Sequence, residues 1–240
     1  MERRRCLLPC ALLILLAPWP GLLLPAQVAA MDYYPLTIGY WWEYESAMGV
    51  EAREVIGTGE IWGNEVAIIR YTASPENLGL ENFWTTTADD DVLLWGFFRD
   101  DINWGMLYDP PIPWIDAPLF LGKAWSHTFL AYELPDTTFC GTFVIDYEVY
   151  EEGIVSTPAG DFYAYGIGSS ARPSLEGHTL SGEISDDLML RNATNWVSDG
   201  VGEVQYWVHV GVPYKLVRYE QPTPVVVQSW GRIRQLCRLP

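Results

Sequence analysis

The stretch Phe143–Val149 (FVIDYEV) decides the fold class of this chain. Large apolar residues stand at every second position, and the two acidic residues, Asp146 and Glu148, stand between them. A period of two residues is typical of a β-strand with one face buried and the other in water. The stretch Val204–Val210 (VQYWVHV) has the same alternation. Both stretches are therefore predicted to be strands.

Outward from these two stretches, strand patterns cover most of the chain. Val92–Phe98 (VLLWGFF) is apolar on both faces, which predicts a strand covered on both sides. Turn-forming residues separate the patterns, and only Ile184–Arg191 is predicted to be helical. The further predicted strands are Tyr40–Ser46, Glu51–Gly57, Glu65–Ala73, Phe83–Ala88, Gly160–Gly168, Leu216–Glu220 and Val225–Arg234. The sequence thus predicts an all-β protein with very little helix.

One eight-residue pattern occurs twice. Pro35–Trp42 and Pro118–Trp125 both read P-L-x-x-G-x-x-W, and strand patterns follow each copy. A glycine suits a tight turn, and the tryptophan that follows would enter a strand and point at the core. We interpret the pair as a duplicated β-meander, with halves 33–117 and 118–220, although four matched residues can recur by chance. The proline-rich stretch Tyr108–Trp114 between the halves is predicted to be a surface loop.

The first thirty residues have the features of a signal peptide. Arg3–Arg5 are basic, Leu7–Leu24 are apolar, and Val28–Ala30 end the segment with small residues. The alternative is an uncleaved membrane anchor, since the apolar run is about the ~18 residues that can span a bilayer. Pro18 and Pro20 inside the run and the small-residue end favour cleavage before Met31. We therefore expect one β-rich domain over 31–240. After cleavage the chain should have no transmembrane span, and the mature protein should lie in the periplasm or outside the cell.

The charge of the chain excludes some partners. It carries 14 basic and 31 acidic side chains, a formal net charge of −17, and no basic cluster follows the leader. Such a field repels phosphate backbones and anionic lipid surfaces. Nucleic acid is therefore not an expected partner. Solubility alone is the simplest interpretation of the charge.

Two cysteines, Cys140 and Cys237, remain after the leader. In an oxidising compartment a lone pair most often closes a disulfide, so we predict that they are bonded to each other. The alternative is two separate buried thiols. A metal site is not expected, because the two cysteines are far apart in sequence and no CxxC is present.

Four ordered motifs resemble a group of exported bacterial β-rich proteins of unknown function. These proteins share a Y-[YF]-P-L-x-x-G-x-x-W-x-Y signature, which Tyr33–Tyr44 matches in full. The others are Pro118–Trp125, a T-P-A-G-x-F turn at Thr157–Phe162, and an aromatic–small–G-V-G segment at Trp196–Val204. The last departs from the pattern at Glu203, where a hydrophobic residue is usual, which makes the final strand pairing less secure.

The resemblance implies a strongly curved antiparallel sheet, distantly like the half-barrels of periplasmic lipoprotein carriers. It implies no activity and no site residues.

No motif points to catalysis, a cofactor or a metal. His127, His178 and His209 lack metal-ligand spacing, and Gly166–Ser170 (GIGSS) lacks the G-x-S-x-G order of a nucleophile elbow. Acidic turns flank Val92–Arg99, but neither has the spaced oxygen ligands of a calcium loop. We therefore expect a protein that is not an enzyme.

Tryptophan is the most informative residue type that remains. The chain has 12, and adjacent Trp41 and Trp42 must point to opposite faces of a strand. Such rings either fill a core or form a platform for a lipid, glycan or peptide ligand. The candidate ligand-binding residues are Trp41, Trp84, Trp95 and Trp207.

These features predict a non-enzymatic exported binding or carrier module that holds an apolar or amphipathic ligand on a concave aromatic face. The alternative is a cell-surface or periplasmic interaction or structural domain. An enclosed apolar cavity would favour the carrier, whereas a filled interior with an exposed aromatic patch would favour interaction.

Overall fold

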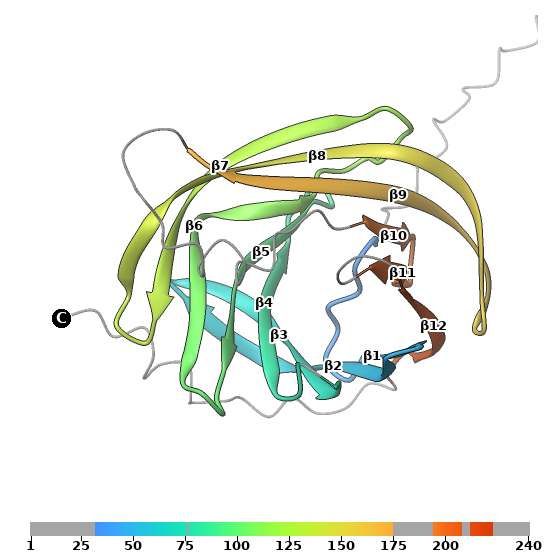
Figure 1. Ribbon diagram of the computed structural model, residues 1–240, viewed down its shortest axis with the longest axis horizontal. Coiled ribbons are helices and arrows are strands. Elements are labelled where there is room, and N and C mark those ends of the chain that lie inside the picture. The colour runs from blue at the N-terminus through green and yellow to red at the C-terminus, as the bar shows by residue number, and fades with distance from the viewer. Residues whose placement is uncertain (1–31, 76, 175–193, 208–211, 223–240) are drawn as a thin grey trace, which may run out of the picture. The chain divides into compact units, whose positions relative to one another are not determined.

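The computed structural model describes residues 32–75, 77–174, 194–207 and 212–222. Every regular element in these ranges is a β-strand, and neighbouring strands pair antiparallel in one closed barrel (Figure 1). The strands are β1 Trp41–Ser46, β2 Gly49–Ile61, β3 Asn64–Ala73, β4 Leu80–Thr86, β5 Val92–Arg99, β6 Trp104–Ile115, β7 Ala124–Leu134, β8 Thr138–Thr157, β9 Gly160–Pro173, β10 Thr194–Ser198, β11 Gly202–Trp207 and β12 Pro213–Glu220. The all-β prediction is confirmed.

The sheet closes because its first strand pairs with its last. β1 pairs with β12 from Trp41↔Glu220 to Glu45↔Lys215, and with β2 on its other side. A closed sheet satisfies the backbone groups that an edge strand would leave unpaired. The expected half-barrel is therefore corrected to a full barrel, and we call the β1–β12 pairing the seam.

Alternation along the strands separates two faces of the sheet. In β8 the residues Phe143, Ile145, Tyr147 and Val149 are buried in the main core. A second buried cluster uses the opposite faces of several strands, including Val66 and Ile68 of β3, Phe83 of β4 and Leu107 of β6. This explains why Val92–Phe98 in β5 is apolar on both faces, as the sequence predicted.

The predicted surface loop Tyr108–Trp114 is wrong, because these residues lie within β6. Pro110 and Pro111 sit where both ladders are interrupted, because pairing with β7 ends at Asp109 and pairing with β5 skips from Leu107 to Ile112. Pro113 stands opposite Leu93 of β5, beyond the end of the β7 ladder. A proline has no N–H to donate, so it is tolerated where no ladder bond is required. Ile112 is fully buried and anchors this part of β6 in the core.

Three predictions fall partly or wholly outside the described residues. They are the helix at Ile184–Arg191, the strand at Val225–Arg234 and the end of the Val204–Val210 strand. The leader, residues 1–30, is also outside the described part of the chain. All remain predictions.

The two copies of the repeated pattern form the same turn. Gly39 and Gly122 have φ angles of 86° and 82°. The amide of the next residue donates back across each turn, from Tyr40 to Thr37 O at 2.9 Å and from Lys123 to Phe120 O at 3.0 Å. A glycine with positive φ at the third position of such a turn defines type II.

The bonds that attach these turns to the sheet also match. The Gly39 amide donates to Val55 O at 2.7 Å, and the Gly122 amide donates to Val149 O at 2.8 Å. A strand follows each turn, β1 or β7, and each pairs with the next strand along the chain. The two segments therefore have equivalent structures, as the repeat requires, while a common origin of the two halves stays a prediction.

The turn glycines give a first test. A Cβ at Gly122 would meet nothing within 4 Å, so only the positive φ opposes a side chain there. Gly122→Val should lower the free energy of unfolding by about 1–2 kcal/mol, and Gly122→Asn by less, because asparagine tolerates this conformation. Urea denaturation measures both. Equal stability of the valine and asparagine variants would contradict the turn assignment.

Candidate functional site

The segment before β1 lies inside the barrel (Figure 1). Tyr33 and Tyr34 are buried in the main core. The Tyr34 ring lies 5.0 Å from Trp84 and 5.8 Å from Trp42, centroid to centroid, and Tyr33 packs edge-on against Tyr165. Aromatic rings and this segment thus occupy part of the interior where a carrier would hold its ligand.

The aromatic residues of the signature close the barrel. Tyr40, Trp42 and Tyr44 occupy alternate positions, so their side chains share one face of the strand. Each donates a side-chain hydrogen bond to a backbone carbonyl of the segment leading into β11. The bonds are Tyr40 Oη to Gly200 O at 2.9 Å, Trp42 Nε1 to Val201 O at 2.6 Å, and Tyr44 Oη to Glu203 O at 3.0 Å. The signature and the late G-V-G segment are therefore one structural unit at the seam.

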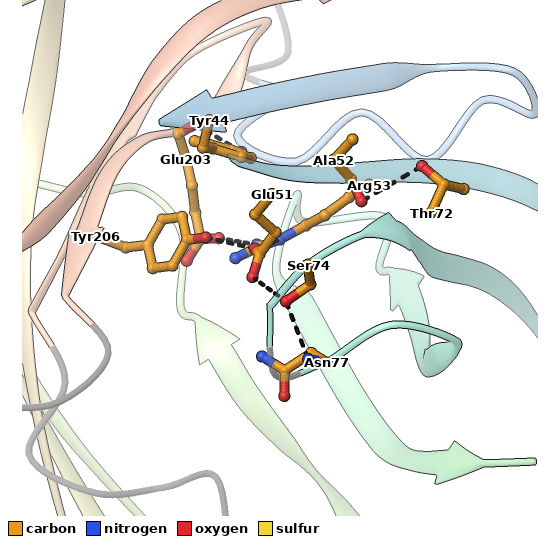
Figure 2. A network of polar contacts seen from close by, with 9 residues as sticks. All are labelled: Tyr44, Glu51, Ala52, Arg53, Thr72, Ser74, Asn77, Glu203 and Tyr206. Carbon is orange, nitrogen blue, oxygen red and sulfur yellow. Dashed lines mark hydrogen bonds and ion pairs between the residues drawn. The ribbon is translucent and has the colours of Figure 1, made fainter. Parts of the chain in front are cut away.

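A buried ionic cluster lies beside this unit (Figure 2). Arg53 Nε donates to Glu51 Oε1 at 2.8 Å, and Arg53 Nη1 donates to Glu203 Oε2 at 2.5 Å. The Tyr206 hydroxyl donates to Glu51 Oε1, and the Ser74 hydroxyl donates to Glu51 Oε2 at 3.4 Å. All three charged side chains are almost completely buried. Glu203, which departs from the family pattern, is thus the partner of a buried arginine.

Aromatic rings enclose the guanidinium. The Arg53 Cζ lies 4.4 Å from the ring centroid of Tyr206, 4.8 Å from that of Tyr71 and 5.0 Å from that of Tyr44. Cation–π contacts of this kind gain strength when water is excluded. They hold the charge at a fixed place between β2 and β11.

Burial acts differently on the members of the cluster. Burial raises the pKa of Glu203, and the Arg53 guanidinium only partly opposes that rise. Burial also opposes the charge on Arg53, but its tyrosine and glutamate neighbours hold the pKa of the guanidinium well above its usual value. Burial likewise raises the pKa of Tyr206 well above the ordinary range, so this hydroxyl remains a neutral donor.

Within the described ranges, no group of three or more His, Cys, Asp or Glu is placed to hold a metal ion.

A surface groove crosses strands β7 to β10, with a volume of about 620 Å³. Its floor and walls follow two cross-strand rows, Ala124–Glu148–Gly168–Thr194 and Ser126–Asp146–Ser170. These positions alternate with core residues such as Tyr147 and Ile167, so they face outward. The groove therefore lies on the outer face of the sheet and belongs to the second half of the chain.

An aromatic wall bounds the groove. Tyr150, which is 41% exposed, lies edge-on to Trp196 at 6.1 Å. The Tyr150 ring covers Gly166, where an added Cβ would come within 2.9 Å of it. Small residues occupy alternate positions along β9, at Gly166, Gly168 and Ser170. They belong to the stretch that lacks the nucleophile-elbow order, and they lie under the groove. This alternation is the sequence signal that could have located the groove.

Polar and acidic side chains line part of the groove. Asp146 accepts a hydrogen bond from Arg172 Nη1 at 2.7 Å, in an ion pair open to solvent. Glu148 is exposed and has no ion-pair partner among the residues the structure describes. Three hydroxyls join the carboxylates, from Ser126, Ser170 and Thr194. Sequence reasoning missed every one of these residues as a candidate.

The four predicted ligand-binding tryptophans are not brought together. Trp84 is buried in the main core, and Trp95 is buried in the second cluster with its Nε1 donating to Thr85 Oγ1 at 3.0 Å. Trp41 is half-buried under the Arg218 guanidinium at 4.8 Å, and Trp207 is half-buried at the end of β11. The opposite orientations predicted for Trp41 and Trp42 are confirmed. Ligand contact by any of the four stays a prediction.

The predicted disulfide has no support from the structure. Cys140 is a free, half-buried thiol in β8, and its Sγ lies 3.4 Å from Thr138 O. Cys237 lies outside the described residues. The bridge remains a prediction.

No protein-family model matches the chain, and no curated protein matches it. Among solved structures, a presumed exported protein with a YmcC-like fold from Bacteroides fragilis is 16% identical with a TM-score of 0.46, over 80% of this chain and all of that one.

Two further solved structures are more distant. A presumed lipoprotein from Parabacteroides distasonis is 13% identical with a TM-score of 0.41, over 80% of this chain and 99% of that one. The hypothetical lipoprotein YmcC from Escherichia coli is also 13% identical, with a TM-score of 0.35, over 83% of this chain and 92% of that one. No described helix is long and apolar enough to cross a membrane.

Proposed function

We propose that the chain is an exported, non-enzymatic binding module, and that its ligand is an uncharged glycan held in the groove over β7–β10. The single observation that carries the proposal is the groove's lining, in which an exposed aromatic ring stands beside carboxylates and hydroxyls on a floor of small residues. The leader-like N-terminus supports export.

The aromatic packing inside the barrel favours a surface site over an internal carrier cavity. Tyr33, Tyr34 and the rings around them occupy the barrel core. The groove volume of about 620 Å³ falls within the roughly 300–1,000 Å³ usual for ligand sites. We therefore place the ligand on the outer face rather than on the concave inner face that the sequence suggested.

The groove chemistry favours sugar hydroxyls. Carboxylates such as Glu148 and Asp146 accept hydrogen bonds from hydroxyl donors, and the serine and threonine hydroxyls can donate or accept. The Tyr150 ring offers apolar area beside these polar groups at low entropic cost. The chain's formal charge of −17 disfavours anionic ligands.

Binding measurements on matched variants test the proposal. Tyr150→Ala and Glu148→Ala should each weaken binding of soluble manno-, cello- or chito-oligosaccharides by about tenfold, a loss of about 1.4 kcal/mol. The melting temperature should hardly change, because both side chains are exposed. Tyr163→Ala is the control, since Tyr163 is 52% exposed on β9 and is not part of the groove lining.

Calorimetry measures the affinities. The proposal fails if none of these uncharged oligosaccharides binds, or if the control variant loses as much affinity as the two groove variants. Equal binding of oligogalacturonides, which are anionic, would contradict the charge argument.

One observation favours the alternative of a protein-interaction domain. Ile154 and Tyr163 form a cross-strand pair on the β8–β9 hairpin and are 66% and 52% exposed. Exposed apolar residues that lie together can mark a partner surface. Binding of a protein partner that Tyr163→Ala removes and Tyr150→Ala leaves intact would support this second function.

A further inference from the structure

We propose that Glu51, Arg53 and Glu203 form a proton-operated latch across the seam: a proton on Glu203 keeps the barrel closed, and its loss loosens the seam. This inference is independent of the glycan site, since the cluster lies in the interior beside β1 and β12.

The charges of the cluster do not balance when both carboxyl groups are ionised. One guanidinium faces two carboxylates, and all three are almost completely buried. The other titratable groups around them are tyrosine hydroxyls: Tyr34 before β1, Tyr44 of β1, Tyr71 of β3 and Tyr206 of β11. No second cation contacts either carboxylate among the residues the structure describes. A buried uncompensated charge is unfavourable, so the closed state favours one bound proton.

Hydrogen bonding assigns that proton to Glu203. Glu51 accepts from three donors, namely Arg53 Nε, the Tyr206 hydroxyl and the Ser74 hydroxyl. Among the donors in the described part of the chain, only Arg53 Nη1 donates to the Glu203 side chain. Donors stabilise the ionised form of a carboxyl group, so the proton is assigned to Glu203, the carboxyl group with fewer donors.

The cluster joins the two sides of the seam. Glu51 and Arg53 belong to β2, next to β1, while Glu203 and Tyr206 belong to β11, next to β12. The backbone ladder between β1 and β12 is irregular, because its register shifts between Glu43 and Tyr44. Side-chain contacts therefore add to the closure of the seam, and the charge of Glu203 can weaken them.

The direction of the pH effect follows from linkage. Burial raises the pKa of Glu203 in the closed barrel above its ordinary value of 4.5. The stabilisation that the proton on Glu203 gives the closed barrel is therefore complete at pH values below the ordinary pKa. It is lost as the pH rises through the raised pKa of the closed state. In that window the seam-opening equilibrium should increase by up to about tenfold for each pH unit.

The test combines two measurements on the exported protein. The ¹³Cδ resonance of Glu203 reports its titration, and native-state amide exchange, corrected for intrinsic pH dependence, reports opening of β1, β11 and β12. We expect Glu203 to titrate above an ordinary glutamate, and seam amides to exchange faster as the pH rises from about 5 to about 9. Amides of β8 and β9, away from the cluster, should not follow this dependence.

Two variants separate the latch from a purely structural role. Glu203→Gln mimics the protonated form and should remove the pH dependence of seam exchange. Glu51→Gln is the matched control, because it leaves Arg53 with one carboxylate and should return Glu203 to the ionised form at neutral pH. The latch is overturned if Glu203 of the unaltered protein titrates at or below the ordinary value, a result that does not depend on either variant folding. It is also overturned if Glu203→Gln keeps the original pH dependence.

Discussion

Replacing Trp42 with alanine should lower the free energy of unfolding by about 3–5 kcal/mol, a large part of the stability of a typical domain. Trp42 is only 1% exposed, packs against Tyr34 and Tyr40, and donates to Val201 O. The substitution removes a large buried ring and leaves that carbonyl without its donor. Urea denaturation measures the loss.

The neighbouring tryptophan is the control. Trp41 is half-buried on the opposite face, so Trp41→Ala should cost about 1 kcal/mol or less. The seam account is contradicted if the two alanine variants lose equal stability. Trp125→Ala should fall between them, since Trp125 is half-buried, stacks on Tyr147 and donates to Pro113 O at 2.8 Å.

Replacing Arg53 with methionine should have a comparably large effect, about 3–5 kcal/mol at neutral pH. The variant leaves Glu51 and Glu203 buried without their shared cation, and breaking a buried ion pair by removing one partner is strongly destabilising. The methionine keeps much of the arginine stem's apolar contact. Unfolding free energies in urea at several pH values measure the loss.

The pH dependence of this variant has a definite sign. Without Arg53 the two carboxyl groups bind protons more tightly in the folded state than in the unfolded state. The lost stability should therefore be partly regained as the pH falls toward the ordinary glutamate range, and the deficit should grow as the pH rises. The triple variant Arg53→Met, Glu51→Gln, Glu203→Gln should recover part of the loss at neutral pH. A deficit that is constant with pH would argue that Arg53 acts only through packing.

Local patterns in the sequence predicted most strands and both tight turns, which are type II in the structure. The alternation in Phe143–Val149 and the glycines at 39 and 122 depend on neighbours in sequence, so a single chain reveals them. The β6 strand was not predicted because its prolines suggested a loop. A proline disrupts a strand only where its missing N–H would have to form a ladder bond, and the positions of those bonds depend on the partner strands β5 and β7.

Contacts between residues far apart in the sequence could not be predicted from the sequence. The seam joins β1 to β12, and no local feature of either strand specifies that pairing over an open edge. Glu203 looked like a defect in the family pattern because its partner, Arg53, lies 150 residues earlier. The candidate groove depends on the register of four strands, which places Glu148 beside Gly168 and Gly168 beside Thr194.

The central claim is that the groove over β7–β10 binds an uncharged glycan, and mapping of backbone amide chemical shifts tests it most directly. The isotopically labelled exported protein would be titrated with manno-, cello- and chito-oligosaccharides. The account predicts saturable shifts confined to residues 124–126, 146–148, 150, 168–170 and 194, which line the groove. Saturable shifts centred instead on Trp41 and Trp207, or no shifts with any of these oligosaccharides, would contradict it.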